Sequence, residues 1–233
     1  MRRPSYVFVT ALVVLALGAT SSTLAGRPDK SWKNWFGHVA AGWGFQQGDG
    51  DEVLDDGFYI NGGATYWPDS WPIGLDLDLA WSQYDVKSSA LRELNDAIED
   101  TGQGRPITSG DSDIISLTAN GIWSPGSGSF GFHLTGGIGA YYIDTGVNTT
   151  GTFYYPPICS PWYYWCVPGG VGPGTVALAS ESSTEFGWNV GVGIDFEVGS
   201  SGSQLFVEIK YHQFELDNGA TTSYAPLVVG YRW

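Results

Sequence analysis

Residues 74–81 read GLDLDLAW, in which Asp76 and Asp78 alternate with Leu75, Leu77 and Leu79. Successive side chains of a β-strand point to opposite faces, so this stretch forms one apolar face and one acidic face. In a water-soluble sheet, the leucines would pack in a core and the aspartates would face solvent. In a membrane-spanning barrel, the leucines would face lipid and the aspartates a polar lumen. The rest of the sequence decides between these two environments.

The first 25 residues have the features of a secretory signal peptide. Arg2 and Arg3 supply the positive charge, residues 6–17 form an apolar core, and residues 23–25 (TLA) are a small-residue cleavage pattern. The apolar run is short for a membrane span, and an uncleaved anchor is the alternative that we weigh against cleavage. We therefore expect a signal peptide over residues 1–25 and a single exported domain over residues 26–233.

The composition favours short strands and turns and argues against nucleic acid as a partner. The 233 residues include 34 Gly, 11 Trp, 13 Tyr and 11 Phe, and only 15% are charged. Removing the signal peptide takes away two of the 10 basic residues and no acidic residue, which leaves 8 against 24 and a formal charge of −16. A phosphate-binding surface needs clustered Lys and Arg, which this chain lacks.

Eight later segments alternate apolar and polar residues with a period of two. They span residues 33–46, 57–67, 74–84, 113–123, 129–142, 185–198, 204–214 and 223–233. Short turns alternate with longer connections, and the three longest cover residues 46–57, 87–111 and 144–180. Membrane barrels of bacteria have short periplasmic turns and long extracellular loops, with both termini on the periplasmic side when the strand number is even. We therefore predict an all-β fold, an eight-stranded antiparallel up-and-down transmembrane β-barrel.

Two further features favour this membrane barrel over a soluble, lipocalin-like barrel. The inferred inner face is too polar and glycine-rich to form a dry core. The apolar face carries aromatic residues towards the strand ends, as interfacial girdles require. These residues are Trp35, Trp43, Tyr66, Trp81, Trp123, Tyr142, Trp188 and Trp233.

The end of the chain carries a family resemblance. Residues 227–233, LVVGYRW, resemble the C-terminal assembly signal of bacterial outer-membrane proteins, and the stretch from residue 207 to the end is similar to their last hairpin. The whole pattern resembles the small eight-stranded barrels of the OmpA-type and OmpW-type outer-membrane β-barrel domain family. This resemblance implies a bacterial outer-membrane location, contact with outer-membrane lipid and lipopolysaccharide, and insertion by the barrel-assembly machinery. It implies no reaction.

The inner face concentrates charged residues in a narrow lumen. Eight strands leave an interior just wide enough for side chains to fill, and buried charges are costly unless they are paired. We predict a salt-bridged plug in which Lys210 and Arg232 are shared among the carboxylates, with His38 and His133 nearby. The predicted lumen charge network consists of Asp76, Asp78, Asp195, Glu197, Glu208, Lys210 and Arg232. Lumen filling is the interpretation that we favour over a gate or a narrow selective path.

The third long loop is the most unusual part of the chain. Cys159 and Cys166 are the only cysteines, and export to an oxidising compartment predicts a disulfide between them. An exposed aromatic patch around them would form a contact surface for a surface protein or a glycan, unless the loop buries its own rings over the barrel mouth. The residues of this loop contact surface are Tyr154, Tyr155, Trp162, Tyr163, Tyr164 and Trp165.

The other two long loops give weaker signals. In the first, acidic residues between positions 49 and 56 could attract calcium or magnesium, but they lack the spacing of an EF-hand, and we favour a solvated acidic loop. In the second, Leu91, Leu94 and Ile98 are spaced like the apolar face of a short helix, with a mobile loop as the alternative.

A catalytic function is not supported by the sequence. Small outer-membrane barrels include lipid A 3-O-deacylases, whose similar penultimate strand carries a histidine with a serine two residues later. Here His212 is followed by Phe214 at the serine position, and hydrolysis lacks a nucleophile beside its base. We therefore predict no catalytic residue, no cofactor and no metal site.

The predicted function is that of a small outer-membrane barrel that acts through its surface loops, in adhesion, surface interaction or envelope integrity. A narrow porin-like channel for small or cationic solutes, attracted by acidic residues, is the alternative. A soluble binding protein and a lipid A hydrolase are ranked below these two.

Overall fold

The computed structural model describes residues 34–68, 71–101, 106–125, 130–155, 158–160, 165–167, 170–198, 202–216, 219 and 221–233. The predicted signal peptide lies outside these residues and remains a prediction. Within them, no helix is long and apolar enough to cross a membrane.

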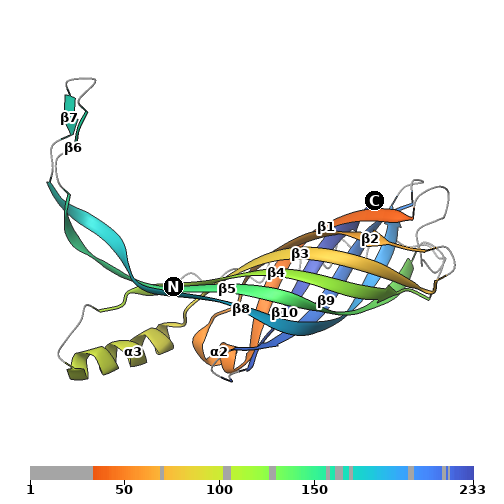
Figure 1. The fold of residues 1–233 in the computed structure, drawn as a ribbon, viewed down its shortest axis with the longest axis horizontal. Coiled ribbons are helices and arrows are strands. Elements are labelled where there is room, and N and C mark those ends of the chain that lie inside the picture. Colours follow the sequence, from red (N-terminus) through yellow and green to blue (C-terminus); the bar gives the residue numbers. More distant parts are fainter. Residues whose placement is uncertain are drawn as a thin grey trace.

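Eight antiparallel strands form a closed barrel in the order β1-β10-β9-β8-β5-β4-β3-β2 (Figure 1). The first and last strands close the ring, with pairs running from His38 opposite Arg232 to Gly48 opposite Thr222. The predicted fold class is confirmed. The strands are β1 (Trp35–Gly48), β2 (Gly57–Tyr66), β3 (Ile73–Asp85), β4 (Ser109–Trp123), β5 (Phe130–Tyr155), β8 (Gly170–Val198), β9 (Ser203–Glu215) and β10 (Thr221–Arg232).

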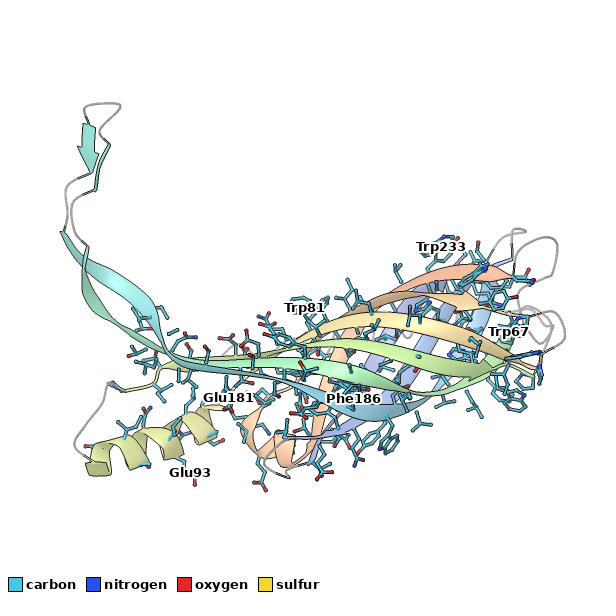
Figure 2. The ribbon with its side chains drawn as sticks, viewed as in Figure 1. Trp67, Trp81, Glu93, Glu181, Phe186 and Trp233 are labelled. Carbon is cyan, nitrogen blue, oxygen red and sulfur yellow. The ribbon has the colours of Figure 1, made fainter. Side chains whose placement is uncertain are left out.

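Burial alternates strictly along β3, which contains the stretch quoted first. Leu77 and Leu79 are 55% and 57% exposed, whereas Asp76 and Asp78 are 6% and 2% exposed. The leucines therefore cover the outer surface and the aspartates point into the lumen. Figure 2 shows the same outward direction for Trp81. The outer face of β3 is apolar because it contacts hydrocarbon. Residues 74–81 therefore belong to a membrane barrel and not to a water-soluble sheet.

The longest predicted loop is largely strand. Residues 144–180 were expected to connect two strands outside the membrane, but β5 continues to Tyr155 and β8 begins at Gly170. The two strands pair along this whole extension, from Asp144 opposite Ser182 to Tyr155 opposite Gly170. The loop prediction is therefore wrong for most of its length. It assumed strands just long enough to cross a membrane, whereas Thr and Val residues on both strands also favour pairing beyond it.

The extension forms a two-stranded ribbon that projects from the extracellular end of the barrel (Figure 1). Its register shifts between Val147 and Asn148, where β8 contributes Leu178 as an extra residue. Such a β-bulge increases the local twist of a strand pair. We call this projecting part, residues 144–155 and 170–182, the ribbon.

Two short strands lie beyond the ribbon, β6 (Ile158–Ser160) and β7 (Trp165–Val167). Their backbone register places Cys159 directly opposite Cys166. This pairing is compatible with the disulfide, which remains a prediction.

Two helices lie at the extracellular side of the barrel (Figure 1). In the expected acidic loop, residues 49–53 form a short helix, α2 (Asp49–Val53), and the carboxylate side chains of residues 51, 52, 55 and 56 are exposed. The second long loop contains α3 (Ser88–Thr101), which confirms the predicted helix. Leu54 bridges to Val86 between them, so the backbone of the two loops is joined beside the barrel mouth.

The lipid-facing direction of β3 can be tested by placing a charge on it. Leu77→Arg puts a cation near the middle of the lipid-facing surface, so we expect it to lower the free energy of unfolding by about 2–4 kcal/mol. Gln83→Arg, on the same face near the extracellular end of β3, should cost about 0–1 kcal/mol. Denaturant unfolding of the protein in lipid vesicles measures both. Equal costs would contradict the assigned position of Leu77 in the membrane.

Candidate functional site

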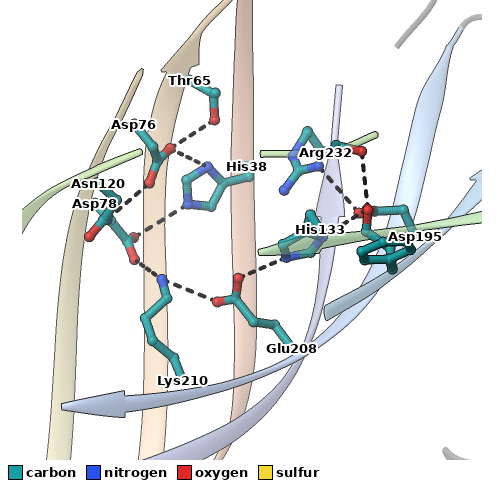
Figure 3. A network of polar contacts seen from close by, with 12 residues as sticks. His38, Thr65, Asp76, Asp78, Asn120, His133, Asp195, Glu208, Lys210 and Arg232 are labelled. Carbon is teal, nitrogen blue, oxygen red and sulfur yellow. Dashed lines mark hydrogen bonds and ion pairs between the residues drawn. The ribbon is translucent and has the colours of Figure 1, made fainter. Parts of the chain in front are cut away.

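The polar side chains of the lumen form one continuous buried network in its periplasmic half (Figure 3). At one end, Arg232 Nη1 lies 3.3 Å from Asp195 Oδ1. Asp195 Oδ2 is 2.7 Å from His133 Nδ1, and His133 Nε2 is 2.8 Å from Glu208 Oε2. Glu208 Oε1 then lies 3.1 Å from Lys210 Nζ. The chain of contacts thus joins side chains from β10, β8, β5 and β9.

The network continues from Lys210 across the lumen to β3 and β1. Lys210 Nζ lies 3.3 Å from Asp78 Oδ2, and Asp78 Oδ1 lies 3.3 Å from His38 Nε2. His38 Nδ1 is 3.6 Å from Asp76 Oδ1. Thr65 donates a hydrogen bond to Asp76 at 2.8 Å, and Asn120 donates to it at 3.3 Å. Every charged side chain in this network is at most 8% exposed.

Glycine residues position both histidines of the network. Gly63 pairs with His38 on one side and with Asp78 on the other, so these three residues lie in one row across the sheet. Gly193 stands in the same way between His133 and Glu208. A Cβ added to Gly63 would come within 2.7 Å of His38 Cε1, and a Cβ on Gly193 would clash with the His133 ring. Each glycine therefore leaves the space through which a histidine reaches an acid two strands away.

The surroundings of His133 define its charge. Both ring nitrogens make short contacts to carboxylate oxygens, and the side chain is fully buried. A neutral imidazole can donate a hydrogen bond through only one nitrogen, whereas the imidazolium form donates to both carboxylates. His133 therefore acts as a third cation of the lumen beside Lys210 and Arg232.

A layer of aromatic side chains fills the lumen on the extracellular side of the charged network. His212 and Tyr224 stack with ring centroids 4.7 Å apart, and Tyr141 Oη lies 3.0 Å from His212 Nδ1. Tyr141 also stacks on Phe214 at 4.9 Å. The members of this aromatic layer are Tyr59, Tyr84, Tyr141, His212, Phe214 and Tyr224, all at most 2% exposed.

The structure brings together six of the seven residues predicted for the lumen network. These are Asp76, Asp78, Asp195, Glu208, Lys210 and Arg232. Glu197 is not among them, because it is exposed near the periplasmic end of β8. The alternation of β8 assigns Glu197 to the inner face but does not show that the lumen has already ended there.

Sequence reasoning missed Phe206 and the aromatic layer. The Phe206 ring lies 5.1 Å from the Arg232 guanidinium carbon and contacts the rings of His38 and His133 edge-on. The sequence contains one indication of them. Phe206, like Tyr59 and Tyr224, occupies a position on the polar face of its alternating segment. An aromatic residue at such a position is a candidate for lumen filling.

Two other sites considered from the sequence are the hydrolase motif and the loop contact surface. His212, which we considered for a hydrolase motif, hydrogen-bonds Tyr141 through Nδ1, and among the described residues its Nε2 atom has no hydrogen-bond partner. The loop contact surface of Tyr154, Tyr155, Trp162, Tyr163, Tyr164 and Trp165 lies outside the residues whose side chains the structure describes.

A closed eight-stranded ring with an apolar outer surface and a charged lumen is the architecture of a bacterial outer-membrane barrel. Residues 10–232 match the outer membrane protein beta-barrel domain, and the chain belongs to this family. Its location is therefore the bacterial outer membrane. Among curated proteins, none matches the chain significantly.

The chain is also similar to several solved structures. Neisserial surface protein A is 12% identical, with 85% of this chain and 96% of that chain covered and a TM-score of 0.47. Ail of Yersinia pestis is 16% identical, with 85% and 98% covered and a TM-score of 0.45. OprG of Pseudomonas aeruginosa is 13% identical, with 86% and 97% covered and a TM-score of 0.37.

Removing the central cation of the network should be strongly destabilising. Lys210→Met leaves Asp78 and Glu208 buried without their shared ammonium, so we expect a loss of about 3–5 kcal/mol in the free energy of unfolding. Lys87→Met is the matched control, because Lys87 pairs at 2.9 Å with the exposed Asp51 and should cost about 0–1 kcal/mol. Denaturant unfolding in vesicles measures both variants. A similar small cost for each would contradict a tightly coupled lumen network.

The charged network and the aromatic layer together predict how the barrel conducts ions. We expect the refolded mature protein to give no steady conductance in a planar bilayer, because the charged network and the aromatic layer both occupy the lumen. The Asp76→Asn, Asp78→Asn double variant serves as the comparison. Steady cation-selective openings of the unaltered protein that change in this variant would contradict the prediction and favour the channel alternative.

Proposed function

We propose that this protein is a surface-interaction protein of the outer membrane, which acts in adhesion through its extracellular ribbon. The observation that carries this proposal is the open edge of β8. The pairing of β8 with β9 begins at Gly187 opposite Phe214, and no strand of the described chain pairs with β8 on that side from Gly170 to Phe186. The ribbon therefore presents a long row of unpaired backbone groups outside the membrane.

The side chains along this edge favour pairing with another chain. Residues 175–180 read TVALAS, which contains β-forming residues and no charge. Val176 and Leu178 are 45% and 41% exposed. Proteins usually protect an open edge with lysine, proline or a short strand, and residues 175–180 contain neither lysine nor proline, with Pro173 preceding them on the same edge. An extended peptide segment of a partner can bind here by strand addition, with Val176 and Leu178 giving selectivity.

The loop contact surface would act at the tip of the same ribbon. Its aromatic residues run from Tyr154 and Tyr155, at the end of β5, to Trp165 at the start of β7, and they precede β8 in the chain. Exposed aromatic patches commonly mark contact surfaces for proteins or glycans. We call residues 154–165, which run from the end of the first strand of the ribbon towards the second in the chain, the tip, and we assign the edge and the tip to one interaction surface that includes Tyr154, Tyr155, Trp162, Tyr163, Tyr164 and Trp165.

Adherence of bacteria that display the protein tests this function. We expect Val176→Lys with Leu178→Lys to reduce adherence to an epithelial monolayer at least tenfold, because charged side chains oppose strand addition at an edge. The matched control is Val53→Lys with Leu94→Lys, which changes two exposed apolar residues on the helices and should leave adherence unchanged. Heat-modifiable migration on gels establishes that each variant is folded in the membrane.

A third variant separates the edge from the tip. Replacing the four aromatic residues at positions 162–165 by serine should also reduce adherence if the tip contributes. The proposed function would be contradicted if cells that display the unaltered protein adhere no better than cells that lack it. Increased detergent sensitivity of a deletion strain, without any loss of adherence, would assign the protein to envelope integrity instead.

A further inference from the structure

We propose that His38, Asp76 and Asp78 form a binding site for a divalent transition metal ion, with Zn²⁺ as the ion that fits the ligands best. The inference is independent of the surface-interaction function. It also departs from the sequence-based expectation of no metal site, because His38 lies 40 positions before Asp78 and no local motif joins them.

The three residues offer a suitable ligand set in a dry position. Each contributes one ligand atom, and these atoms lie within 4.8 Å of one another. The His38, Asp76 and Asp78 side chains are only 6%, 3% and 2% exposed. Imidazole nitrogen together with carboxylate oxygen is a common ligand combination for Zn²⁺, at about 2.0–2.2 Å from the metal.

The second histidine of the lumen provides a comparison for the geometry at His38. His133 also lies between two carboxylates, and its contacts of 2.7 and 2.8 Å are ordinary charge-assisted hydrogen bonds. At His38, Nε2 lies 3.3 Å from Asp78 and Nδ1 lies 3.6 Å from Asp76, and among the described residues Nδ1 has no hydrogen-bond partner. Two ligands of a tetrahedral zinc ion are separated by about 3.4 Å, given the usual bond lengths. The 3.3 Å between His38 Nε2 and Asp78 Oδ1 matches that separation, and the ligand atom of Asp76 lies within 4.8 Å of both.

The neighbouring amides supply an independent observation. Asn61 donates to both oxygens of Asp78, and Asn120 donates to Asp76. Each carboxylate of the site therefore has an amide donor that holds its oxygens in position, as the outer-shell partners of metal-ligating carboxylates do.

The charges of the lumen point the same way. Lys210 contacts Oδ2 of Asp78, which leaves Oδ1 facing His38. In the described part of the chain, no Lys or Arg lies within ion-pair distance of Asp76. With His133 as an imidazolium and His38 neutral, as metal ligation requires, four carboxylates face three cations, and Asp76 is the carboxylate without a Lys or Arg partner among the described residues. A buried carboxylate without a cation is costly, so a positive ion is favoured at this end of the network.

Metal content of the refolded mature protein tests the site. The protein, without an affinity tag, is refolded with Zn²⁺ and passed through a desalting column after treatment with a weak chelator, and bound zinc is measured by mass spectrometry. We expect about one zinc per chain, and at least tenfold weaker binding for His38→Gln and for Asp76→Asn. His133→Gln is the matched control, because it removes the other carboxylate-bound histidine and should retain zinc.

The order of addition and a spectroscopic probe sharpen the result. Since the ligands are buried, zinc added after refolding should bind much more slowly than zinc present during refolding. Co²⁺ in place of zinc should give visible absorption bands of nitrogen and oxygen coordination that disappear in His38→Gln. Heat-modifiable migration verifies the fold of each variant. No zinc on the unaltered protein, or equal zinc on all variants, would overturn the proposal.

Discussion

The structure depends on one constraint, the absence of hydrogen-bond partners for the backbone in a lipid bilayer. A sheet in hydrocarbon must pair every strand on both sides, so the first and last strands have to meet. The pairing of β1 with β10, from His38 to Gly48, satisfies this requirement. Closure with eight strands also sets the width of the lumen, and a narrow lumen requires each inward charge to find a partner nearby.

The lumen solves this problem by distributing charge over most of the barrel wall. Lys210 is shared by Asp78 and Glu208, and His133 is shared by Asp195 and Glu208. Neither histidine could reach its acid across an intervening strand if that strand carried a side chain at the crossing point. Gly63 and Gly193 are thus structural elements of the network. The glycine-rich inner face, which in sequence looks like an absence of side chains, creates the room in which the charged side chains meet.

The sequence predicts the barrel well because period-two alternation and closure are nearly sufficient to define it. The outward leucines of β3 and the inward Asp76 and Asp78 follow from counting alone. The partners within the lumen do not follow, because stagger between strands decides which inward residues share a level. Glu197 shows this limit. It was correctly assigned to the inner face of β8, but its height along the barrel places it at the exposed end of the strand. The ribbon was missed for a related reason, because alternation does not reveal where the membrane ends.

The ribbon and the barrel illustrate opposite consequences of the same backbone chemistry. Within the membrane, β8 is paired on both sides, with β5 and with β9. Beyond Gly187 towards the extracellular side, β9 no longer pairs with it, and the outer edge is left to water, which can satisfy the backbone groups that lipid cannot. Water is a partner that another chain can replace, so an edge that would be intolerable in the bilayer becomes a binding surface above it. Extending two strands of an existing barrel therefore provides an interaction site without a separate domain, and its position relative to the membrane is fixed by the barrel.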